Sequence, residues 1–220
     1  ERESAWREMA KQVAHEIKNP LTPMKLSVQQ LLRVYDPENP ASAQKLEKVV
    51  NSLIEQIDVL TNIANEFSNF AKMPRQNEER IDLLGLINNV VELFRNDGVV
   101  EIELKSQITK AMIMADKDQL LRVFNNLIKN SIQAIPAERK GKITIQIEQS
   151  KKYVEIHIQD NGTGISAEQR VKLFVPYFTT KSTGSGLGLA MCKQIIESHR
   201  GTIELDSTSD EGTLFTVRLP

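Results

Sequence analysis

The sequence predicts an α+β protein in two parts, an antiparallel helical hairpin followed by an α/β sandwich with one mixed sheet covered by helices. Two observations support this fold class. Apolar residues recur every three or four positions in the first part, whereas several later segments alternate apolar and polar residues. The first spacing is typical of amphipathic helices and the second of half-buried strands. We therefore expect a hairpin domain over residues 1–73, a linker over 74–80 and a second domain over 81–220.

Two long helices make up the expected hairpin. The first carries an apolar stripe at Trp6, Ala10, Val13, Ile17, Leu21, Met24, Val28 and Leu31, and the second at Leu46, Val49, Leu53, Ile57, Leu60, Ala64, Phe67 and Ala71. The turn-forming segment Asp36–Pro40 separates them. Two helices alone bury little surface, and pairing two hairpins into a dimeric four-helix bundle would cover the stripes. We expect a homodimer; the alternative is a monomeric hairpin packed on the second domain.

The second part mixes both periodicities. Segments 83–95 and 116–135 have the spacing of helices. Strand-like alternation occurs at 99–105, 111–116, 142–150, 152–160, 201–207 and 212–220. Helices interspersed with neighbouring strands favour a mixed sheet with helices packed on it.

Composition narrows the function classes. The 220 residues are 40% hydrophobic and 26% charged with a net charge of −1, which is typical of a soluble globular protein without the basic field of a nucleic-acid binder. The single cysteine, Cys192, excludes an internal disulfide framework, favours a reducing compartment and lies in an apolar run, where we expect a buried small hydrophobe. We find no signal peptide and no membrane-spanning stretch. Because the chain begins within a helical pattern, we expect a fragment of a longer protein.

His15 lies off the apolar stripe of the first helix. It is two residues from both Val13 and Ile17, about 200° around a helix from each, so it faces away from the stripe. The neighbouring Glu16 can hydrogen-bond the imidazole or take its proton. The zinc motif H-E-x-x-H is incomplete because position 19 is Asn, so we expect no zinc site. An ordinary exposed histidine is the alternative interpretation.

Two prolines follow His15 within the same helical pattern. Pro20 cannot donate to the carbonyl of Glu16, and Pro23 cannot donate to that of Asn19. Each costs about 3 kcal/mol in an ordinary helix interior. We expect a bend close to residues 16–20 that lets another domain approach His15.

Polar residues form two clusters in the second part. Asn126 and Asn130 share one helix face, and amide oxygens suit Mg²⁺ with phosphate oxygens as co-ligands. Asp160 ends a strand and is followed by Gly162 and Gly164. A carboxylate accepts hydrogen bonds and so favours the 6-amino group of adenine over the 6-oxo group of guanine. The alternative is a tight turn after a strand.

A third cluster precedes an apolar helix. Gly184, Gly186 and Gly188 lead into that helix, whose N–H groups and dipole can bind phosphates. The pattern is neither a P-loop nor a Rossmann fingerprint. Thr180 and Lys181 lie just upstream and could contact phosphate. We interpret residues 165–185 as a mobile lid over the nucleotide, anchored by Phe174 and Phe178.

These motifs resemble, over essentially the whole chain, the catalytic core of bacterial sensor histidine kinases of two-component systems. "HEIKNPL" resembles the H box, "NNLIKNSIQA" the N box, "DNGTGI" the G1 box, "LFVPYFTTK" the F box and "GSGLGLA" the G2 box. The segments "AWREMAKQVAHEIKNPLTP" and "ANEFSNFAKMP" further resemble the nitrogen-regulation branch, the NtrY-like sensors. The resemblance implies a dimerisation and histidine-phosphotransfer hairpin followed by an ATP-binding domain of the Bergerat type.

The resemblance also implies roles for individual residues. His15 would be the phosphoacceptor that attacks the γ-phosphate of ATP, and Glu16 would hold or deprotonate its ring. Asn19 matches the position that orients water to dephosphorylate the partner's phosphoaspartate, so we also expect phosphatase activity. Asn130 would ligate Mg²⁺. The expected nucleotide-binding positions are Asn126, Asn130, Asp160, Gly162, Gly164, Thr180, Lys181, Gly184, Gly186, Leu187, Gly188 and Thr213.

One position departs from the family pattern. Many members carry Lys three residues after the magnesium asparagine, whereas this chain has Gln133. We expect Lys129 or Lys181 to counter the phosphate charge instead. Two other functions compete with the kinase: an ATPase of the related chaperone, gyrase and mismatch-repair group that phosphorylates no histidine, and a degenerate dimeric scaffold.

The expected partner is the receiver domain of a response regulator, NtrX-like by family analogy, and we expect no nucleic-acid partner. We expect a cytoplasmic core, with the full-length protein anchored in the inner membrane by regions outside this fragment. The signal sensed, and whether phosphorylation occurs within or between protomers, are not encoded in this stretch.

Overall fold

The structure is a computed structural model that describes residues 2–34, 40–71, 77–95, 100–176, 178–179, 186–209 and 212–220. Within these ranges the side chains of residues 2–12, 15–16, 32, 34, 40–42, 62, 65–71 and 206–209 lie outside the description. The chain forms two compact units, the helical hairpin and an α/β unit, which are described separately below. No helix in the described ranges is long and apolar enough to cross a membrane.

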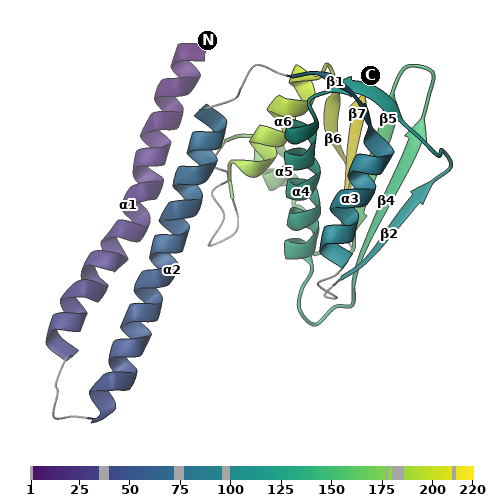
Figure 1. The fold of residues 1–220 in the computed structure, drawn as a ribbon. Helices are drawn as coiled ribbons and strands as arrows, with labels where there is room; N and C mark the ends of the chain where they lie inside the picture. Colours follow the sequence, from purple (N-terminus) through teal and green to yellow (C-terminus); the bar gives the residue numbers. More distant parts are fainter. Residues whose placement is uncertain are drawn as a thin grey trace. The chain divides into compact units, whose positions relative to one another are not determined.

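The first unit is the predicted hairpin. Helix α1 spans Arg2–Val34 and α2 spans Pro40–Ala71, and the two run side by side (Figure 1). Val13, Val49 and Ile63 are buried. Val13 and Val49 lie on the stripes that the sequence indicates, whereas Ile63 precedes the stripe position Ala64, which is exposed. Helix α1 continues through Pro20 and Pro23 as one helix.

The second unit is built on a five-stranded mixed sheet. Its strands are β2 (Val100–Ser106), β4 (Gly141–Gln149), β5 (Val154–Asp160), β7 (Gly212–Leu219) and β6 (Thr202–Ser209), in that spatial order. Strand β2 is parallel to β4, and the other neighbours are antiparallel. A separate two-stranded sheet pairs β1 (Glu79–Asp82) with β3 (Met112–Ala115).

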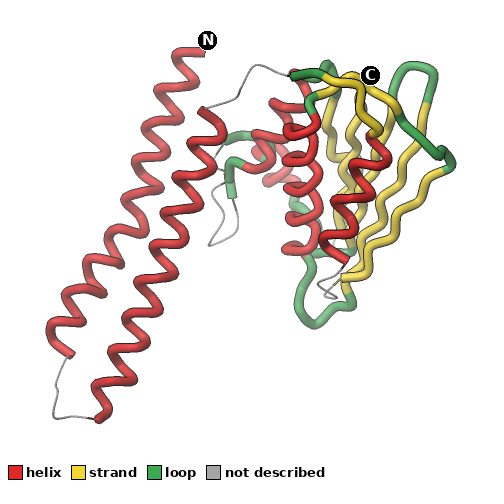
Figure 2. The backbone as a smooth tube through the Cα atoms, viewed as in Figure 1, coloured by secondary structure: helices red, strands yellow, loops and turns green. Residues whose placement is uncertain are grey.

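Helices cover one face of the large sheet. They are α3 (Leu83–Arg95), α4 (Lys117–Ala134) and α6 (Gly188–Ser198), while α5 (Ala167–Lys172) is a short helix after β5 (Figures 1 and 2). The core lies between the two layers and includes Phe124, Leu127, Ile145 and Ile158, all fully buried. Strand β4 buries every second residue, as its sequence predicts. The predicted hairpin and helix-covered mixed sheet are confirmed.

Two details differ from the sequence prediction. The segment 111–116 forms β3, which pairs with the unpredicted strand β1 rather than joining the large sheet. Residues 167–172 form α5 inside the predicted lid, where Ser166 and Gln169 make a capping box. Strand β1 has four residues and α5 has six, too few to produce a clear periodic pattern.

Candidate functional site

Helix α4 presents the two asparagines that the sequence indicates. The Asn130 Nδ2 group donates to Asn126 Oδ1 at 3.2 Å, so the i, i+4 pair does share a face. Both side chains are half-buried. The helix is fixed at its start by Asp116, whose carboxylate accepts from the Gln119 backbone N–H. The pair therefore stands on a capped helix that packs into the core.

The N-terminus of α6 lies against Asn126. A Cβ added at Gly188 would come within 2.5 Å of Asn126 Oδ1, closer than real Cβ contacts. Leu187, directly before the helix, is buried, and Gly186 has a positive φ of 68°. The structure thus brings the first residues of α6 and the α4 asparagines together, and a glycine at position 188 leaves room between them.

Asp160 lies at the end of β5 on the helix-covered face. Its side chain is only 4% exposed, and Oδ1 accepts from the Gly162 backbone N–H at 2.9 Å. Thr213 of β7 is its register partner and is also buried. A Cβ at Gly162 would lie 2.7 Å from the carbonyl oxygen of Ala134, so the turn after β5 rests on the last turn of α4. Gly164 follows with a positive φ of 74°.

Ser131 is a residue that the sequence reasoning missed. Its Oγ is the one buried side-chain nitrogen or oxygen without a hydrogen-bond partner among the residues that the structure describes. It follows Asn130 directly on α4 and is 1% exposed. A buried hydroxyl without a partner costs about 1–3 kcal/mol unless water or a ligand satisfies it.

The residue types suit an adenine nucleotide with Mg²⁺. The Asp160 carboxylate can accept from an amino group, and the asparagine amide oxygens are hard ligands for Mg²⁺. Within the described ranges, no cluster of three or more His, Cys, Asp or Glu residues could hold a metal ion by itself. The Asn130 amide oxygen, with oxygens of the nucleotide's phosphates, would hold Mg²⁺ at this site.

Several predicted site residues lie outside what the structure describes. Thr180, Lys181 and Gly184 fall in the undescribed segment 180–185. The backbones of His15 and Glu16 belong to α1, but their side chains are not described. Asn19, one turn after His15, is exposed.

The structure describes the surroundings of several other positions that the sequence analysis singled out. Lys129 and Gln133 are exposed on α4. Phe174 and Phe178 are half-buried, and Lys193 Nζ of α6 lies 5.6 Å from the Phe174 ring centroid. Cys192 is fully buried, as predicted, and burial raises the pKa of its thiol to about 12, so it stays protonated.

Known proteins resemble both units. Residues 5–76 match the family described as "His Kinase A (phospho-acceptor) domain", and residues 115–220 match "Histidine kinase-, DNA gyrase B-, and HSP90-like ATPase". The chain is 35% identical over 225 residues to "Nitrogen regulation protein NtrY" of Azorhizobium caulinodans, covering all of this chain and 29% of that protein. It is 32% identical over 220 residues to "Putative sensor histidine kinase NtrY-like" of Rickettsia felis, covering 99% of this chain and 36% of that protein.

A solved structure extends the likeness. The histidine kinase ThkA, crystallised in complex with the response regulator protein TrrA, superposes with a TM-score of 0.76 at 26% identity. The match covers 100% of this chain and 63% of that one. The chain spans about a third of the length of the curated relatives it matches, at 36% and 29% of the two named above.

Proposed function

The chain belongs to the sensor histidine kinases, and from this membership we propose that it transfers the γ-phosphoryl group of ATP to His15 and then to an aspartate of a response regulator. The observation that carries the proposal is the joint presence of two parts in one chain. A helical hairpin bears His15. In the α/β unit, Asn126 contacts Asn130 and lies against Gly188, and the buried Asp160 is held by the Gly162 N–H.

The chemistry at His15 follows from its residue types. An imidazole nitrogen attacks the γ-phosphorus, a P–N bond forms, and the bond from that phosphorus to the bridging oxygen breaks. ADP leaves with the electron pair, and the adjacent Glu16 accepts the ring proton. Bound Mg²⁺, held by Asn130, would neutralise charge on the phosphates. Asp160, fixed by the Gly162 N–H, accepts from the adenine amino group.

The remaining nucleotide contacts are part of the same proposal. The glycines at 162, 164, 184, 186 and 188, with Leu187 and Thr213, shape the pocket, while Thr180 and Lys181 or Lys129 face the phosphates. We assign residues 1–73 to dimerisation and phosphotransfer, 74–80 to a linker, and 81–220 to ATP binding. Support comes from the two family matches: the first covers residues 5–76 and ends inside this linker, and the second covers residues 115–220.

A second activity is supported by Asn19. Its side chain is exposed on α1, one helical turn after His15. An exposed amide there can orient a water towards the phosphoaspartate of a docked receiver domain. We therefore include phosphatase activity towards the same response regulator.

Exposed apolar side chains and the related proteins indicate the partners that we propose. Large apolar side chains stay exposed on the hairpin, which favours a homodimer; they are Leu21, Leu26, Val28, Val50, Ile54 and Ile57. The receiver domain is proposed to be NtrX-like, because curated relatives are NtrY proteins. We place the core in the cytoplasm, with the full-length protein anchored in the inner membrane by segments outside this chain.

Incubation of the chain with Mg²⁺ and γ-labelled ATP separates the kinase from its two rivals. The kinase gives protein-bound label that is labile in acid and stable in base, and that moves to an added receiver domain. Phosphate release without protein labelling would favour the simple ATPase, and an absence of turnover would favour the scaffold.

A further inference from the structure

The turn that follows Asp160 is held by two successive peptide groups. The Gly162 N–H donates to Asp160 Oδ1 at 2.9 Å, and the Thr163 N–H donates to the Ala134 carbonyl at 3.0 Å. The first bond fixes the carboxylate, and the second fixes the turn on α4. The direction of both N–H groups therefore sets where the Asp160 carboxylate points.

The carbonyl ends of the same two peptide groups meet one side chain. Arg139 Nη1 donates to the Asn161 carbonyl at 2.5 Å and to the Gly162 carbonyl at 2.8 Å. In a trans peptide group, C=O and N–H point in opposite directions. A cation that holds the carbonyls of Asn161 and Gly162 on one side therefore directs the N–H groups of Gly162 and Thr163 to the other.

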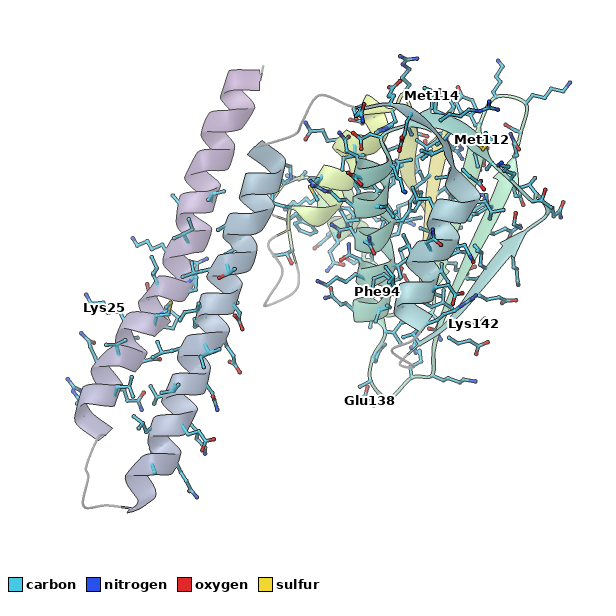
Figure 3. All side chains as sticks on the ribbon, in the orientation of Figure 1. Lys25, Phe94, Met112, Met114, Glu138 and Lys142 are labelled. Carbon is cyan, nitrogen blue, oxygen red and sulfur yellow. The ribbon has the colours of Figure 1, made fainter. Side chains whose placement is uncertain are left out.

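Arg139 itself is fixed by its loop. It lies in the connection 135–140 between α4 and β4, where its backbone N–H donates to the Pro136 carbonyl at 3.0 Å. Figure 3 labels Glu138 in this loop and Lys142 in the strand that follows, both towards the lower end of this unit. The loop is tied to the turn a second time through Asn161, whose side chain accepts from the Lys142 N–H at 2.8 Å and donates to the Lys140 carbonyl at 2.9 Å.

We propose that Arg139 is a positioning residue for adenine recognition, acting through the peptide groups that aim Asp160. The inference rests on the proposed ATP site. In this role Arg139 does not contact the nucleotide. It restricts rotation of the peptide groups in the turn, so the Asp160 carboxylate is already oriented before the nucleotide binds. Because it acts at the adenine end, it affects ATP and ADP alike, whereas a phosphate-contacting residue would discriminate between them.

Arg139→Ala in the 220-residue chain is expected to raise the Kd for ADP and for a non-hydrolysable ATP analogue by the same factor, about three- to tenfold. The KM for ATP rises with it, while kcat at saturating ATP is unchanged. Arg139→Lys, which offers a cation without the planar fork, recovers part of the loss. The matched control is Lys140→Ala, which removes a cation from the same loop but keeps the backbone carbonyl that Asn161 uses.

Amide hydrogen exchange without nucleotide gives an independent readout. Arg139→Ala should speed exchange at Gly162 and Thr163 and leave the amides of strand β4 unchanged. Equal nucleotide affinity in wild type and Arg139→Ala would overturn the inference, as would a general rise in exchange that marks a loss of stability. If the wild type binds no adenine nucleotide, the proposed function fails, and the exchange data still decide whether Arg139 orders the turn.

Discussion

Asp116 is a buried carboxylate at the junction of three segments. It accepts from the backbone N–H groups of Asn77 and Gln119, and its own N–H donates to His199 Nε2 at 2.9 Å. Since Nε2 accepts, the proton of a neutral ring sits on Nδ1 and is donated to the Ile195 carbonyl. These bonds join the segment before β1 to the start of α4 and the end of α6, the two helices that frame the site.

The charge of Asp116 should make stability depend on pH. Burial alone would raise the pKa of Asp116, but hydrogen bonds from the N–H groups of Asn77, Gln119 and Asp118 outweigh it and lower the pKa. A lowered folded-state pKa means that the stabilisation is present above the ordinary value of about 4 and is lost as pH falls through the folded value. Asp116→Asn should therefore reduce the free energy of unfolding by about 1 kcal/mol at pH 7.

Urea unfolding of the two proteins between pH 7 and pH 3 checks this expectation. The difference between wild type and Asp116→Asn should begin to shrink below about pH 4, where the unfolded chain binds a proton at this position, and should disappear once the folded carboxylate is protonated as well. Asp118→Asn, at an exposed position in the same turn, is the control. A difference that stays constant across this range would show that the charge has no part in it.

Gly188 is expected to be needed for space rather than for backbone freedom. Alanine favours helices by about 1 kcal/mol over glycine, so Gly188→Ala should not unfold α6. Its Cβ would push Asn126 aside, since the distance to Oδ1 would be 2.5 Å. Overpacking of this kind costs about 1–3 kcal/mol, so nucleotide affinity should fall roughly tenfold or more. Isothermal titration with ADP measures it, and Gly85→Ala on α3, where the nearest atom is 3.2 Å away, should bind normally.

Some residues of the site could be predicted from sequence and others could not. Asn126 and Asn130 follow from helical spacing, and Asp160 from its place at a strand end. His199 and Asp116 are 83 positions apart in the sequence, and Arg139 and Asn161 are 22 positions apart. Each of these hydrogen bonds forms only once the sheet and helices have brought the two residues together, so the local sequence could not predict it. Ser131 had a local signal, since it directly follows Asn130 on the buried face of α4.

At the scale of elements, α1 is the helix with an unusual sequence. It continues through Pro20 and Pro23, and between them the Thr22 hydroxyl donates to the Lys18 carbonyl at 3.2 Å. Such a bond from Thr to the fourth preceding carbonyl often accompanies bending. The expected bend close to residues 16–20 stays a prediction.

Pro20→Ala tests whether the prolines serve flexibility. Restoring an N–H and removing the ring should stabilise the hairpin by up to about 3 kcal/mol and should slow phosphorylation or phosphotransfer at His15. Thermal unfolding and labelling kinetics measure the two effects. Pro40→Ala is the control, because the first position of α2 needs no N–H donor. A stabilised variant with unchanged kinetics would reject a functional role for the bend.

The long periodic elements were predicted, and so was β3, but its partner strand β1 and helix α5 were not. Each hairpin helix exceeds 30 residues, and β4 alternates buried and more exposed residues from Gly141 to Glu148. Strands β1 and β3 have four residues each, and their pairing depends on a contact between distant segments. Helix α5 carried a readable signal in the Ser166–Gln169 capping box, although six residues give no reliable period.

At the scale of the whole molecule, the hairpin exposes apolar side chains that a partner should cover. Ile54 is 50% exposed on α2 and Leu26 is 61% exposed on α1. Ile54→Glu should shift a dimer towards monomer, because burying an unpaired carboxylate is costly. Sedimentation velocity measures the mass. Leu93→Glu, at an exposed apolar position on α3 that is 65% exposed, should leave the dimer intact, and a wild-type monomer would contradict the four-helix bundle.

The most direct test of the proposed function is the position of the phosphoryl group. The chain has three histidines, and two of them are held in the α/β unit: His157 bonds Thr216 Oγ1 on the sheet, and His199 is buried. Mass spectrometry of the chain after incubation with ATP and Mg²⁺, with digestion at neutral to basic pH, locates the group. We expect phosphate on His15 alone, abolished by His15→Gln and retained in His157→Gln. Phosphate on another residue would contradict the assignment. So would a His15→Gln variant that still becomes labelled by ATP.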